Sequence, residues 1–322
     1  MNATLDQMTS ALNSCGENSP FLLQNEDAYR SWRAHKLECR ERLEPARVFA
    51  LNGQGQIDAA MKPELQAQVE AFNFIVFECP DDGLRESFDS NALLSLGRQF
   101  GLGDLDSNPG AEADSVTALR VVEAGDRRAQ YIPYTNRAMN WHTDGYYNPE
   151  GRRIGAFALY CLHQAVRGGA NYLFDHEMMY ILVRDHSAEL LEALMCDDMM
   201  CVPANVQDNR VIRAEETGPV FSLQPYSCAL NMRYTSRPHN IVWKSDNLSA
   251  SALNLVREIL MDGAATTEIR LRSGQGIVCN NILHGRQAFH DAPGKPGRLV
   301  YRARYYDAVD LDSGMAQEAA SG

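Results

Sequence analysis

The pair His142 and Asp144, two residues apart within the run Trp141 to Gly145, constrains how this chain can fold more than any other feature. On an extended strand, side chains at positions i and i+2 point to the same face, so an imidazole and a carboxylate at this spacing can chelate one metal ion. Such a pair is common by chance, and most pairs of this kind are surface or hydrogen-bonded core residues. A metal site therefore requires a third ligand from a strand elsewhere in the sequence.

His284, within the run Asn281 to Arg286, is the candidate for this third ligand. Two histidines and one carboxylate on one face of an octahedron are the ligand set of non-heme Fe(II) oxygenases. The three remaining positions then suit a bidentate co-substrate and dioxygen. The three residues predict a mononuclear iron site built from two separate strands.

A cationic strand follows this third candidate ligand. Residues 298–305 alternate, which places Arg298, Arg302 and Arg304 on one face. Because a buried unpaired charge is costly, these guanidiniums face either water or a cavity that receives anions. At about 3.3 Å per residue, Arg298 and Arg302 lie roughly 13 Å apart along the strand, so they can serve two different anions. The alternative is an edge strand whose arginines lie in water.

These segments resemble the Fe(II)/2-oxoglutarate-dependent dioxygenases of the taurine dioxygenase-like superfamily. The resemblance rests on Trp141-His-Thr-Asp144, on His284-Gly-Arg-Gln-Ala-Phe289, and on Arg298 followed by Arg302. Residues 131–185 and 218–307 are most similar to γ-butyrobetaine and trimethyllysine hydroxylases, followed by clavaminate synthase-like oxygenases. The resemblance implies Fe(II), with 2-oxoglutarate and O2 as co-substrates, and hydroxylation of a substrate C–H with release of succinate and CO2.

The same resemblance assigns roles to individual residues. It implies that His142, Asp144 and His284 bind the iron and that Arg298 binds the distal carboxylate of 2-oxoglutarate. Where the family often has Thr or Ser after a Gly-Gly pair, this chain has Asn171, whose amide can still donate to a carboxylate. Radical halogenases of the superfamily lack the carboxylate ligand, so its presence here favours hydroxylation over halogenation.

Five further residues are candidates for substrate contacts. Arg302 matches a family position that often binds the acidic group of the substrate, and its planar fork suits a carboxylate or sulfonate. Tyr146 and Tyr147 can offer aromatic faces to an ammonium group, although tyrosines on such a loop more often pack against a sheet. Arg233 and Tyr234 lie where related hydroxylases bring substrate-contacting residues. We expect a small anionic or zwitterionic substrate such as an amino acid, a betaine or a sulfonate.

Two interpretations stay open for the acidic residues Asp175 and Glu177. They lie at the start of an expected helix, where carboxylates complement the helix dipole. They could equally neutralise an amine of the substrate. His176 between them is a poor third metal ligand, because it should leave the strand face with the helix.

Short strands joined by long helical connections predict a mainly β fold with flanking helices. The expected helices lie at 26–43, from Pro63, at 92–100 with Asn91 as the cap, at 178–195 and at 249–261; the expected strands lie at 74–77, 116–122, 155–163, 170–174, 211–213, 220–223 and 229–234, with a hairpin at 268–280 that delivers His284. This pattern favours a double-sheet jelly roll. The family resemblance implies the same fold, a double-stranded β-helix. We expect residues 1–50 to form a partly helical N-terminal extension and residues 51–322 to form the jelly-roll domain with inserted helices.

The composition excludes some classes of function. A formal net charge of −12 and a pI near 5.1 argue against nucleic acid as a partner. No apolar run approaches the roughly 20 residues that span a membrane, and residues 1–18 lack the features of a signal peptide. The 8 cysteines show no Cys-x-x-Cys spacing, so we expect them to be reduced. We expect a cytoplasmic enzyme with a small-molecule substrate, whose helical N-terminal additions are compatible with a homo-oligomer.

Two other classes of protein remain compatible with the sequence. A metal-dependent hydrolase that uses zinc or manganese could employ the same three ligands, but it would not need Arg298. A non-enzymatic small-molecule-binding protein would keep the jelly roll without oxygen chemistry. The presence of the three candidate ligands together with Arg298 speaks against this last class.

Overall fold

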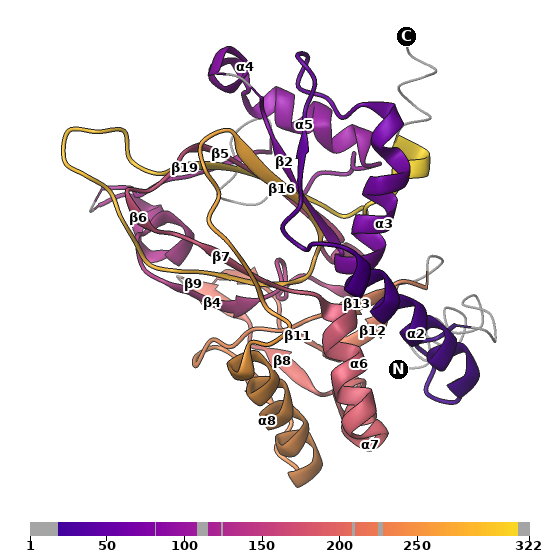
Figure 1. Cartoon of the computed structure of the whole chain (residues 1–322). Coiled ribbons are helices and arrows are strands. Elements are labelled where there is room, and N and C mark those ends of the chain that lie inside the picture. The colour runs from indigo at the N-terminus through magenta and orange to yellow at the C-terminus, as the bar shows by residue number, and fades with distance from the viewer. Residues whose placement is uncertain are drawn as a thin grey trace. The chain divides into compact units, whose positions relative to one another are not determined.

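A computed structural model describes residues 19–80, 82–107, 115–123, 125–207, 210–224 and 228–314 of the chain. The described residues form two compact units: unit 1 contains residues from 19–41 and 174–266, and unit 2 contains residues from 42–173 and 267–314. Both units combine helices and strands (Figure 1), so the fold is mixed where the sequence predicted a mainly β protein. The expected boundary at residue 50 stays a prediction.

A six-stranded sheet forms a large part of unit 2 (Figure 1). In spatial order its strands are β1 (Val48–Ala50), β2 (Phe74–Glu78), β16 (Gln275–Asn280), β5 (Ala156–His163), β19 (Leu299–Tyr305) and β3 (Thr117–Leu119). β1 and β2 are parallel, and the other neighbours are antiparallel. β2 and β5 consist almost entirely of buried residues, as strands do when both faces of a sheet are covered.

Helices α3 (Lys62–Phe72) and α5 (Ser90–Gln99) pack against this sheet. Leu65 of α3 and Leu93 of α5 belong to one buried core with Phe77 and Tyr160 of the sheet. α3 has its proline in the first turn, where the missing N–H is no loss. The cap of α5 is Asp89, which accepts a hydrogen bond from Ala92, and not Asn91 as expected. The helices therefore place the main apolar core of unit 2 on one side of the sheet.

A second sheet of unit 2 contains β15 (Thr267–Ile269), β7 (Asn171–Phe174), β17 (Leu283–Arg286) and β4 (Met139–His142), in that order. The expected hairpin at 268–280 is wrong, because β15 pairs with β7 whereas β16 pairs with β2 and β5. The chain changes sheets near Gly274, which has a φ of 89° and exchanges backbone hydrogen bonds with Cys79 and Cys161. Alternation along a strand indicates its buried face but not its neighbour.

Smaller elements complete unit 2. They are the helix α4 (Asp82–Ser87), the 3-10 turns Ala59–Met61, Arg127–Gln130, Ile132–Tyr134 and Glu150–Arg152, and the paired strands β6 (Arg167–Gly168) and β18 (Phe289–His290). The loop expected at residues 101–113 is described as far as residue 107, and the rest of it lies outside the described residues.

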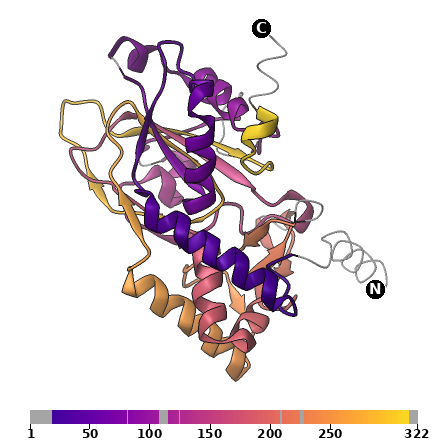
Figure 2. The same cartoon turned by 45° about the vertical axis from the view of Figure 1, so that its right-hand side comes forward.

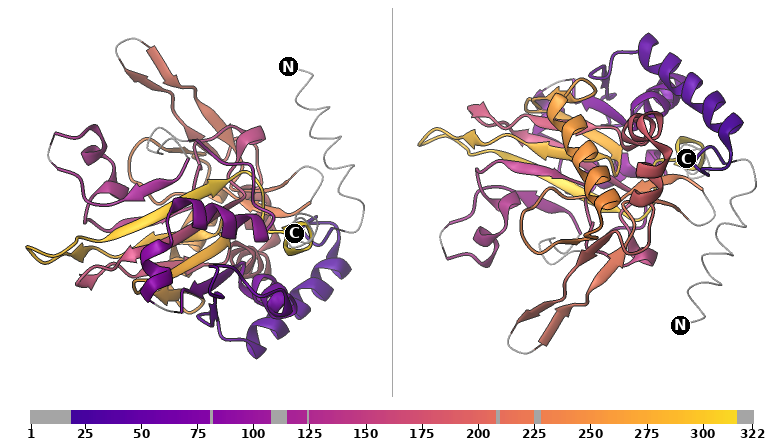
Figure 3. Two further views of the ribbon diagram at one scale, coloured as in Figure 1. Left: turned by 90° about the horizontal axis from the view of Figure 1, so that it is seen from above. Right: turned by 90° about the horizontal axis from the view of Figure 1, so that it is seen from below.

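Unit 1 contains four helices and seven short strands among the described residues. They are α2 (Glu26–Arg42), α6 (His176–His186), α7 (Ala188–Leu194), α8 (Asn247–Asp262), β8 (Met200–Val202), β9 (Asn205–Gln207), β10 (Arg210–Arg213), β11 (Glu216–Gly218), β12 (Phe221–Leu223), β13 (Leu230–Met232) and β14 (Val242–Trp243). β9 and β10 form a projecting hairpin (Figure 3). The single helix expected at 178–195 is two helices, because Ser187 has an extended backbone and caps α7 through Leu190.

Helix α2 runs beside α6 in unit 1 (Figure 2). The buried Lys36 of α2 forms ion pairs with Asp175, at 2.8 Å, and with Glu177. Arg40 adds a further ion pair to Asp175 at 3.2 Å. Asp175 also caps α6 by accepting from the backbone N–H of Glu177. Both carboxylates thus serve the helix terminus and its ion pairs, which favours this interpretation over binding of a substrate amine.

Two remaining expectations concern thiols and membranes. Cys39, Cys79, Cys161, Cys196, Cys201 and Cys279 are free thiols. Cys228 is disulfide-bonded, so the expectation that all cysteines are reduced is wrong at this position. In the described residues, no helix has both the length and the apolar character needed to cross a bilayer.

Candidate metal centre

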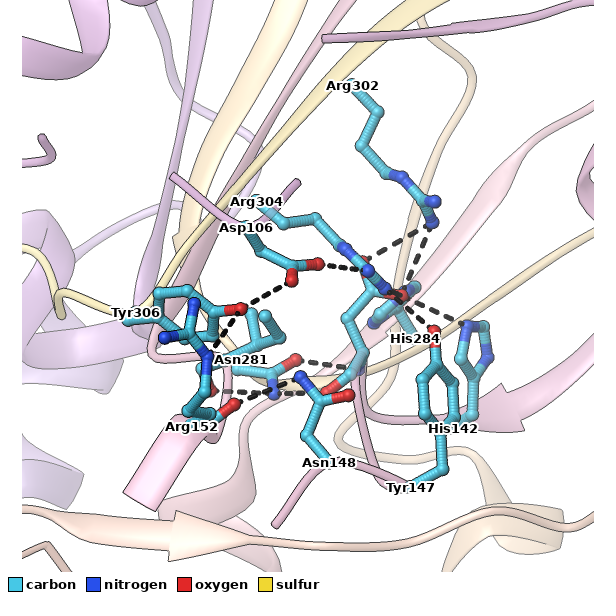
Figure 4. Close-up of polar contacts among 12 residues, drawn as sticks. Asp106, His142, Tyr147, Asn148, Arg152, Asn281, His284, Arg302, Arg304 and Tyr306 are labelled. Carbon is cyan, nitrogen blue, oxygen red and sulfur yellow. Dashed lines mark hydrogen bonds and ion pairs between the residues drawn. The ribbon is translucent and has the colours of Figure 1, made fainter. Parts of the chain in front are cut away.

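Strand pairing brings His142, Asp144 and His284 together in unit 2. His142 of β4 lies directly opposite His284 of β17, and the centres of the two rings are 4.3 Å apart (Figure 4). His142 Nε2 lies 3.9 Å from Asp144 Oδ1. One ligand atom from each residue can be chosen so that all three lie within 4.8 Å of one another. β4 ends at His142, so Asp144 reaches the cluster from the following turn and not from the strand itself.

Both imidazoles are held by their Nδ1 atoms. Nδ1 of His142 lies 2.9 Å from the carbonyl oxygen of Asn140, and Nδ1 of His284 lies 3.0 Å from that of Ile282. A neutral ring that donates through Nδ1 has its lone pair on Nε2, which is how metal-binding histidines are usually oriented. Burial lowers the pKa of both histidines. The pKa of His142 falls to about 3, because electrostatic repulsion from His284 adds to the effect of burial. The rings are therefore neutral near pH 7 and able to bind a cation.

Asn281 fixes the backbone of Asp144. Its side-chain oxygen accepts from the N–H of Asp144 at 2.8 Å, and its amide nitrogen donates to the carbonyl oxygens of Asp144 and Ile154 at 2.8 and 3.0 Å. Gly145 follows with a φ of 63°, and a Cβ at this position would lie 2.5 Å from Ile154 Cγ1. The sequence alone assigns no role to Asn281, whose only signal is its place in the run that contains His284.

Two arginines of β19 reach the carboxylate of Asp144 (Figure 4). Nη1 of Arg302 lies 3.3 and 3.4 Å from its two oxygens, and Nη1 of Arg304 lies 3.7 Å from Oδ1. Burial alone would raise the pKa of Asp144, but the charges of Arg302 and Arg304 hold it well below its usual range. The Nε atoms of both arginines are buried without a hydrogen-bond partner among the described residues. The carboxylate is therefore ionised and ready to bind a metal.

Arg298 lies just before β19 in a different environment. Its side chain is buried and its guanidinium is centred 5.2 Å from the middle of the Phe289 ring. Its backbone N–H donates to Asp291 at 3.0 Å, but no carboxylate in the described part of the chain forms an ion pair with its guanidinium. Burial lowers the pKa of Arg298. Such a charge is costly unless an anion compensates it, so this position suits a carboxylate ligand.

Asn171 and the two tyrosines also lie in unit 2. The Asn171 amide is buried and donates to the carbonyl oxygen of Ile269 at 3.4 Å. The Tyr147 hydroxyl accepts from Arg304 at 3.3 Å and lies beside His142 in Figure 4. The ring of Tyr146 is buried and packs edge-on against that of Tyr147, at 5.3 Å between centres. Of the pair, Tyr147 is the one that the structure brings to the metal cluster.

Arg233 and Tyr234 belong to unit 1. The buried guanidinium of Arg233 donates to the backbone oxygens of Met200, Gly218 and Glu216 at 2.8, 3.4 and 2.8 Å. Tyr234 is buried against Trp243, at 5.9 Å between ring centres. These contacts hold unit 1 together, and the assignment of both residues to substrate binding stays a prediction.

Comparison with known proteins places the chain in a family. Residues 39–304 match the family described as "Taurine catabolism dioxygenase TauD, TfdA family". The chain belongs to the TauD/TfdA family. Among curated relatives of this TauD/TfdA protein, a uridine-5'-phosphate dioxygenase from Streptomyces sp is 24% identical over 270 residues, which cover 80% of this chain and 94% of the relative. Another of the same name, from Amycolatopsis sp, is 31% identical over 183 residues, or 54% of this chain and 63% of the relative.

Solved oxygenase structures share the fold of the TauD/TfdA protein. An asparagine oxygenase in complex with Fe(II), 2S,3S-3-hydroxyasparagine and succinate has a TM-score of 0.55 at 16% identity, covering 95% of this chain and 92% of that one. The non-heme iron oxygenase OrfP in complex with Fe and alpha-ketoglutaric acid has a TM-score of 0.60 at 13% identity, covering 81% and 94%.

Membership of the TauD/TfdA family confirms the expected class of enzyme. The protein is a 2-oxoglutarate-dependent dioxygenase that uses Fe(II), 2-oxoglutarate and O2. The alternatives of a hydrolase and of a non-enzymatic binding protein are therefore set aside. The narrower similarity to the γ-butyrobetaine, trimethyllysine and clavaminate synthase-like branches stays a prediction.

Proposed function

We propose that this dioxygenase hydroxylates an unactivated C–H of a small anionic substrate at a centre where His142, Asp144 and His284 hold Fe(II). The observation that carries the proposal is the convergence of two neutral, oriented imidazoles and one ionised carboxylate, with ligand atoms within 4.8 Å of one another. Three ligands of these types leave open positions for a chelating co-substrate and O2. The two sheets of unit 2, and the fold shared with solved oxygenases, support a double-stranded β-helix around the centre.

Arg298 and Asn171 are the proposed partners of the distal carboxylate of 2-oxoglutarate. Gly168 pairs with Phe289, and the carbonyl oxygen of Ala170 accepts from the N–H of Gln287. The segment that leads to Asn171 therefore lies beside Phe289, whose ring packs against Arg298. Gly169 has a φ of 75°, and a Cβ there would lie 3.5 Å from Arg298 Nε. The buried guanidinium, which forms no ion pair among the described residues, then receives an anion.

The chemistry divides between the bound reactants and the chain. Bound Fe(II) supplies activation of O2, coupled to conversion of 2-oxoglutarate to succinate and CO2. The chain orients the ligands through Asn281 and the two Nδ1 contacts. Arg302 then holds the anionic group of the substrate; its Nη1 already contacts Asp144, whereas its buried Nε has no hydrogen-bond partner among the described residues.

Two classes of substrate have an anionic group that suits this site. A carboxylate or sulfonate suits the planar fork of Arg302, and an amino acid, betaine or sulfonate is the first candidate. A phosphate monoester is the second candidate, because both curated relatives are named uridine-5'-phosphate dioxygenases. Arg302 and Arg304 lie on the same side of β19, and paired arginines are a common means of binding phosphate.

The first experiment measures binding of 2-oxoglutarate to the Fe(II) protein without O2, through the visible charge-transfer band of the chelated complex. Hydrogen bonds to charged groups contribute about 1.5–3 kcal/mol, so Arg298→Ala should weaken 2-oxoglutarate binding by roughly ten- to a hundredfold. Arg30→Ala is the control, because it removes a guanidinium whose side chain is 70% exposed and pairs with Glu26, and it should leave this affinity within about threefold of wild type. Unchanged affinity in the Arg298 variant would show that the co-substrate lies elsewhere.

A second experiment identifies the substrate class from succinate release. Amino acids, betaines, sulfonates and nucleoside 5'-monophosphates would be compared at equal concentration. Arg302→Lys should raise the KM of the true substrate, because the ammonium group cannot reproduce a bidentate contact. Stimulation by nucleoside monophosphates alone would select the second candidate. A substrate whose KM is the same in both proteins would remove Arg302 from the substrate site.

A further inference from the structure

Arg304 links the metal cluster to a carboxylate outside the ligand set (Figure 4). Its Nη2 forms an ion pair with Asp106, and its Nη1 lies 3.3 Å from the Tyr147 hydroxyl and 3.7 Å from Asp144 Oδ1. The side chain is only 4% exposed. One buried guanidinium therefore contacts both a proposed metal ligand and a second acid that has no contact with the metal residues.

Asp106 is held firmly in this position. Its backbone N–H donates to the carbonyl oxygen of Arg304 at 2.9 Å. The backbone N–H of Tyr306 donates to the carbonyl oxygen of Asp104 at 2.8 Å. Leu105 forms an antiparallel bridge with Tyr305 between these bonds. The second carboxylate oxygen of Asp106 accepts from the Tyr306 hydroxyl at 2.6 Å. The segment thus continues the sheet along the end of β19 and fixes Asp106 against Arg304.

The charges explain why this placement matters for metal binding. Arg302 and Arg304 both approach Asp144, but the carboxylate of Asp144 must also offer an oxygen to a cation. Asp106 compensates the charge of Arg304 and draws one end of its guanidinium away. Without that carboxylate, Arg304 would pair more closely with Asp144 and compete with the metal for the same lone pairs.

We propose that Asp106 is a positioning residue of the metal centre, which acts by holding Arg304 so that the Asp144 carboxylate stays oriented and available for a divalent cation. This inference rests on the proposed role of Asp144 as a ligand. Among the described residues, the Asp106 carboxylate contacts Arg304 and Tyr306 and none of the three proposed metal ligands. Its effect must therefore pass entirely through Arg304.

The test measures Mn(II) binding to the full-length metal-free protein by calorimetry, so that no turnover is needed. Loss of a residue that orients a metal ligand typically weakens metal binding by 10- to 100-fold, and we expect at least a tenfold loss for Asp106→Asn. Asp104→Asn is the matched control, because it removes an exposed carboxylate two residues away that has no contact with Arg304. It should bind Mn(II) as wild type does.

A double-mutant comparison separates positioning from general damage. In an Arg304→Gln protein, the additional change Asp106→Asn should cause no further loss of Mn(II) affinity, because residues that act through one another are not additive. Additive losses, or wild-type affinity in Asp106→Asn, would overturn the inference. If Asp106→Asn does not fold, Asp106→Ala removes the same carboxylate, and wild-type Mn(II) affinity in that variant would overturn the inference as well.

Asp144→Asn distinguishes this inference from the proposed function. The variant should lose measurable Mn(II) binding. Retained binding would show that the three proposed ligands are wrong, whatever Asp106 does. If Asp144→Asn loses Mn(II) binding but Asp106→Asn binds Mn(II) as wild type does, the assignment of the three ligands stands. Only the proposed role of Asp106 is then wrong.

Discussion

At the scale of single residues, Asn281 provides no ligand atom, yet its three hydrogen bonds determine where the backbone of Asp144 lies. The side chain is 6% exposed, so water cannot replace these bonds easily. A carboxylate that reaches the metal from a turn needs such a restraint, because no strand pairing fixes it. The geometry of the centre therefore depends on an amide outside the ligand set.

We predict that Asn281→Ala destabilises the protein and weakens metal binding together. A hydrogen bond contributes about 1 kcal/mol and an unsatisfied buried group costs about 1–3 kcal/mol, so the free energy of unfolding should fall by about 2–4 kcal/mol. Urea unfolding of the metal-free protein and Mn(II) calorimetry measure the two effects. Asn148→Ala, which removes one 3.0 Å hydrogen bond to the carbonyl oxygen of Arg152, should cost less than about 1 kcal/mol. Equal costs for the two variants would refute the special role of Asn281.

The arginines show what the sequence reveals about single residues and what it does not. Alternation predicts that Arg298, Arg302 and Arg304 share a face, and Arg302 and Arg304 do approach the same carboxylate. Alternation does not predict that Arg304 pairs with Asp106, because Asp106 comes from a distant segment. Nor does it predict that the Arg298 guanidinium forms no ion pair among the described residues. Asn281 was missed for the same reason.

At the scale of elements, the turn after β4 decides whether His142 and Asp144 can serve one metal. Gly145 occupies the left-handed region at a φ of 63°, and Ile154 and Asn148 pack where a side chain would begin. A Cβ there would lie 2.5 Å from Ile154 Cγ1 and 3.1 Å from Asn148 Nδ2. The turn therefore needs glycine for two independent reasons, conformation and space.

We predict that Gly145→Ala costs more stability than conformational strain alone. Gly294 is the matched control, because it has a φ of 75° with no atom within 4 Å of a built Cβ. A non-glycine residue in this backbone region costs of order 1–3 kcal/mol. Gly294→Ala should show a loss of that size in thermal unfolding, and Gly145→Ala should exceed it and also weaken Mn(II) binding. If Gly145→Ala costs no more than the control, the contact with Ile154 is not limiting.

The elements themselves were largely predictable, and their pairing was not. The helix expected at 26–43 is confirmed as α2, and Gly263 ends α8 in the left-handed conformation as the pattern indicated. The hairpin expected at 268–280 failed because hydrophobic alternation gives no information about the neighbouring strand. The three metal residues could be nominated from sequence only because their residue types and spacing carry chemistry, whereas the strand pairing of His142 with His284 required the fold.

At the scale of the whole chain, unit 1 joins segments that are far apart in the sequence. The N-terminal helix α2 is tied to α6 by Lys36, whose ammonium group is buried between Asp175 and Glu177. Breaking a buried ion pair from one side costs about 3–5 kcal/mol, because it leaves an uncompensated charge. This network is therefore a sensitive point for the stability of unit 1, and it makes that stability depend on pH.

Asp175 sets the direction of this dependence. Burial alone would raise the pKa of Asp175, but the charges of Lys36, His176 and Arg40 outweigh it and lower the pKa to about 2. In the unfolded chain the pKa of an aspartate is about 3.9, so on acidification the unfolded state takes up the proton first. The stabilisation by Asp175 is therefore complete above about pH 4 and is lost as the pH falls towards about 2.

We predict that Asp175→Asn lowers the free energy of unfolding at pH 7 by about 3–5 kcal/mol and flattens its fall between about pH 4 and pH 2. Urea unfolding of the full-length protein, followed by tryptophan fluorescence across this range, measures both effects. Asp198→Asn is the control: this carboxylate is 64% exposed and forms a 2.8 Å surface ion pair with Lys244, which should contribute at most about 1 kcal/mol. A curve for Asp175→Asn that stays parallel to the wild-type curve below about pH 4 would mean that other carboxylates govern the acid transition. A flattened curve would show that the ion pairs between α2 and α6 limit the stability of unit 1 in acid.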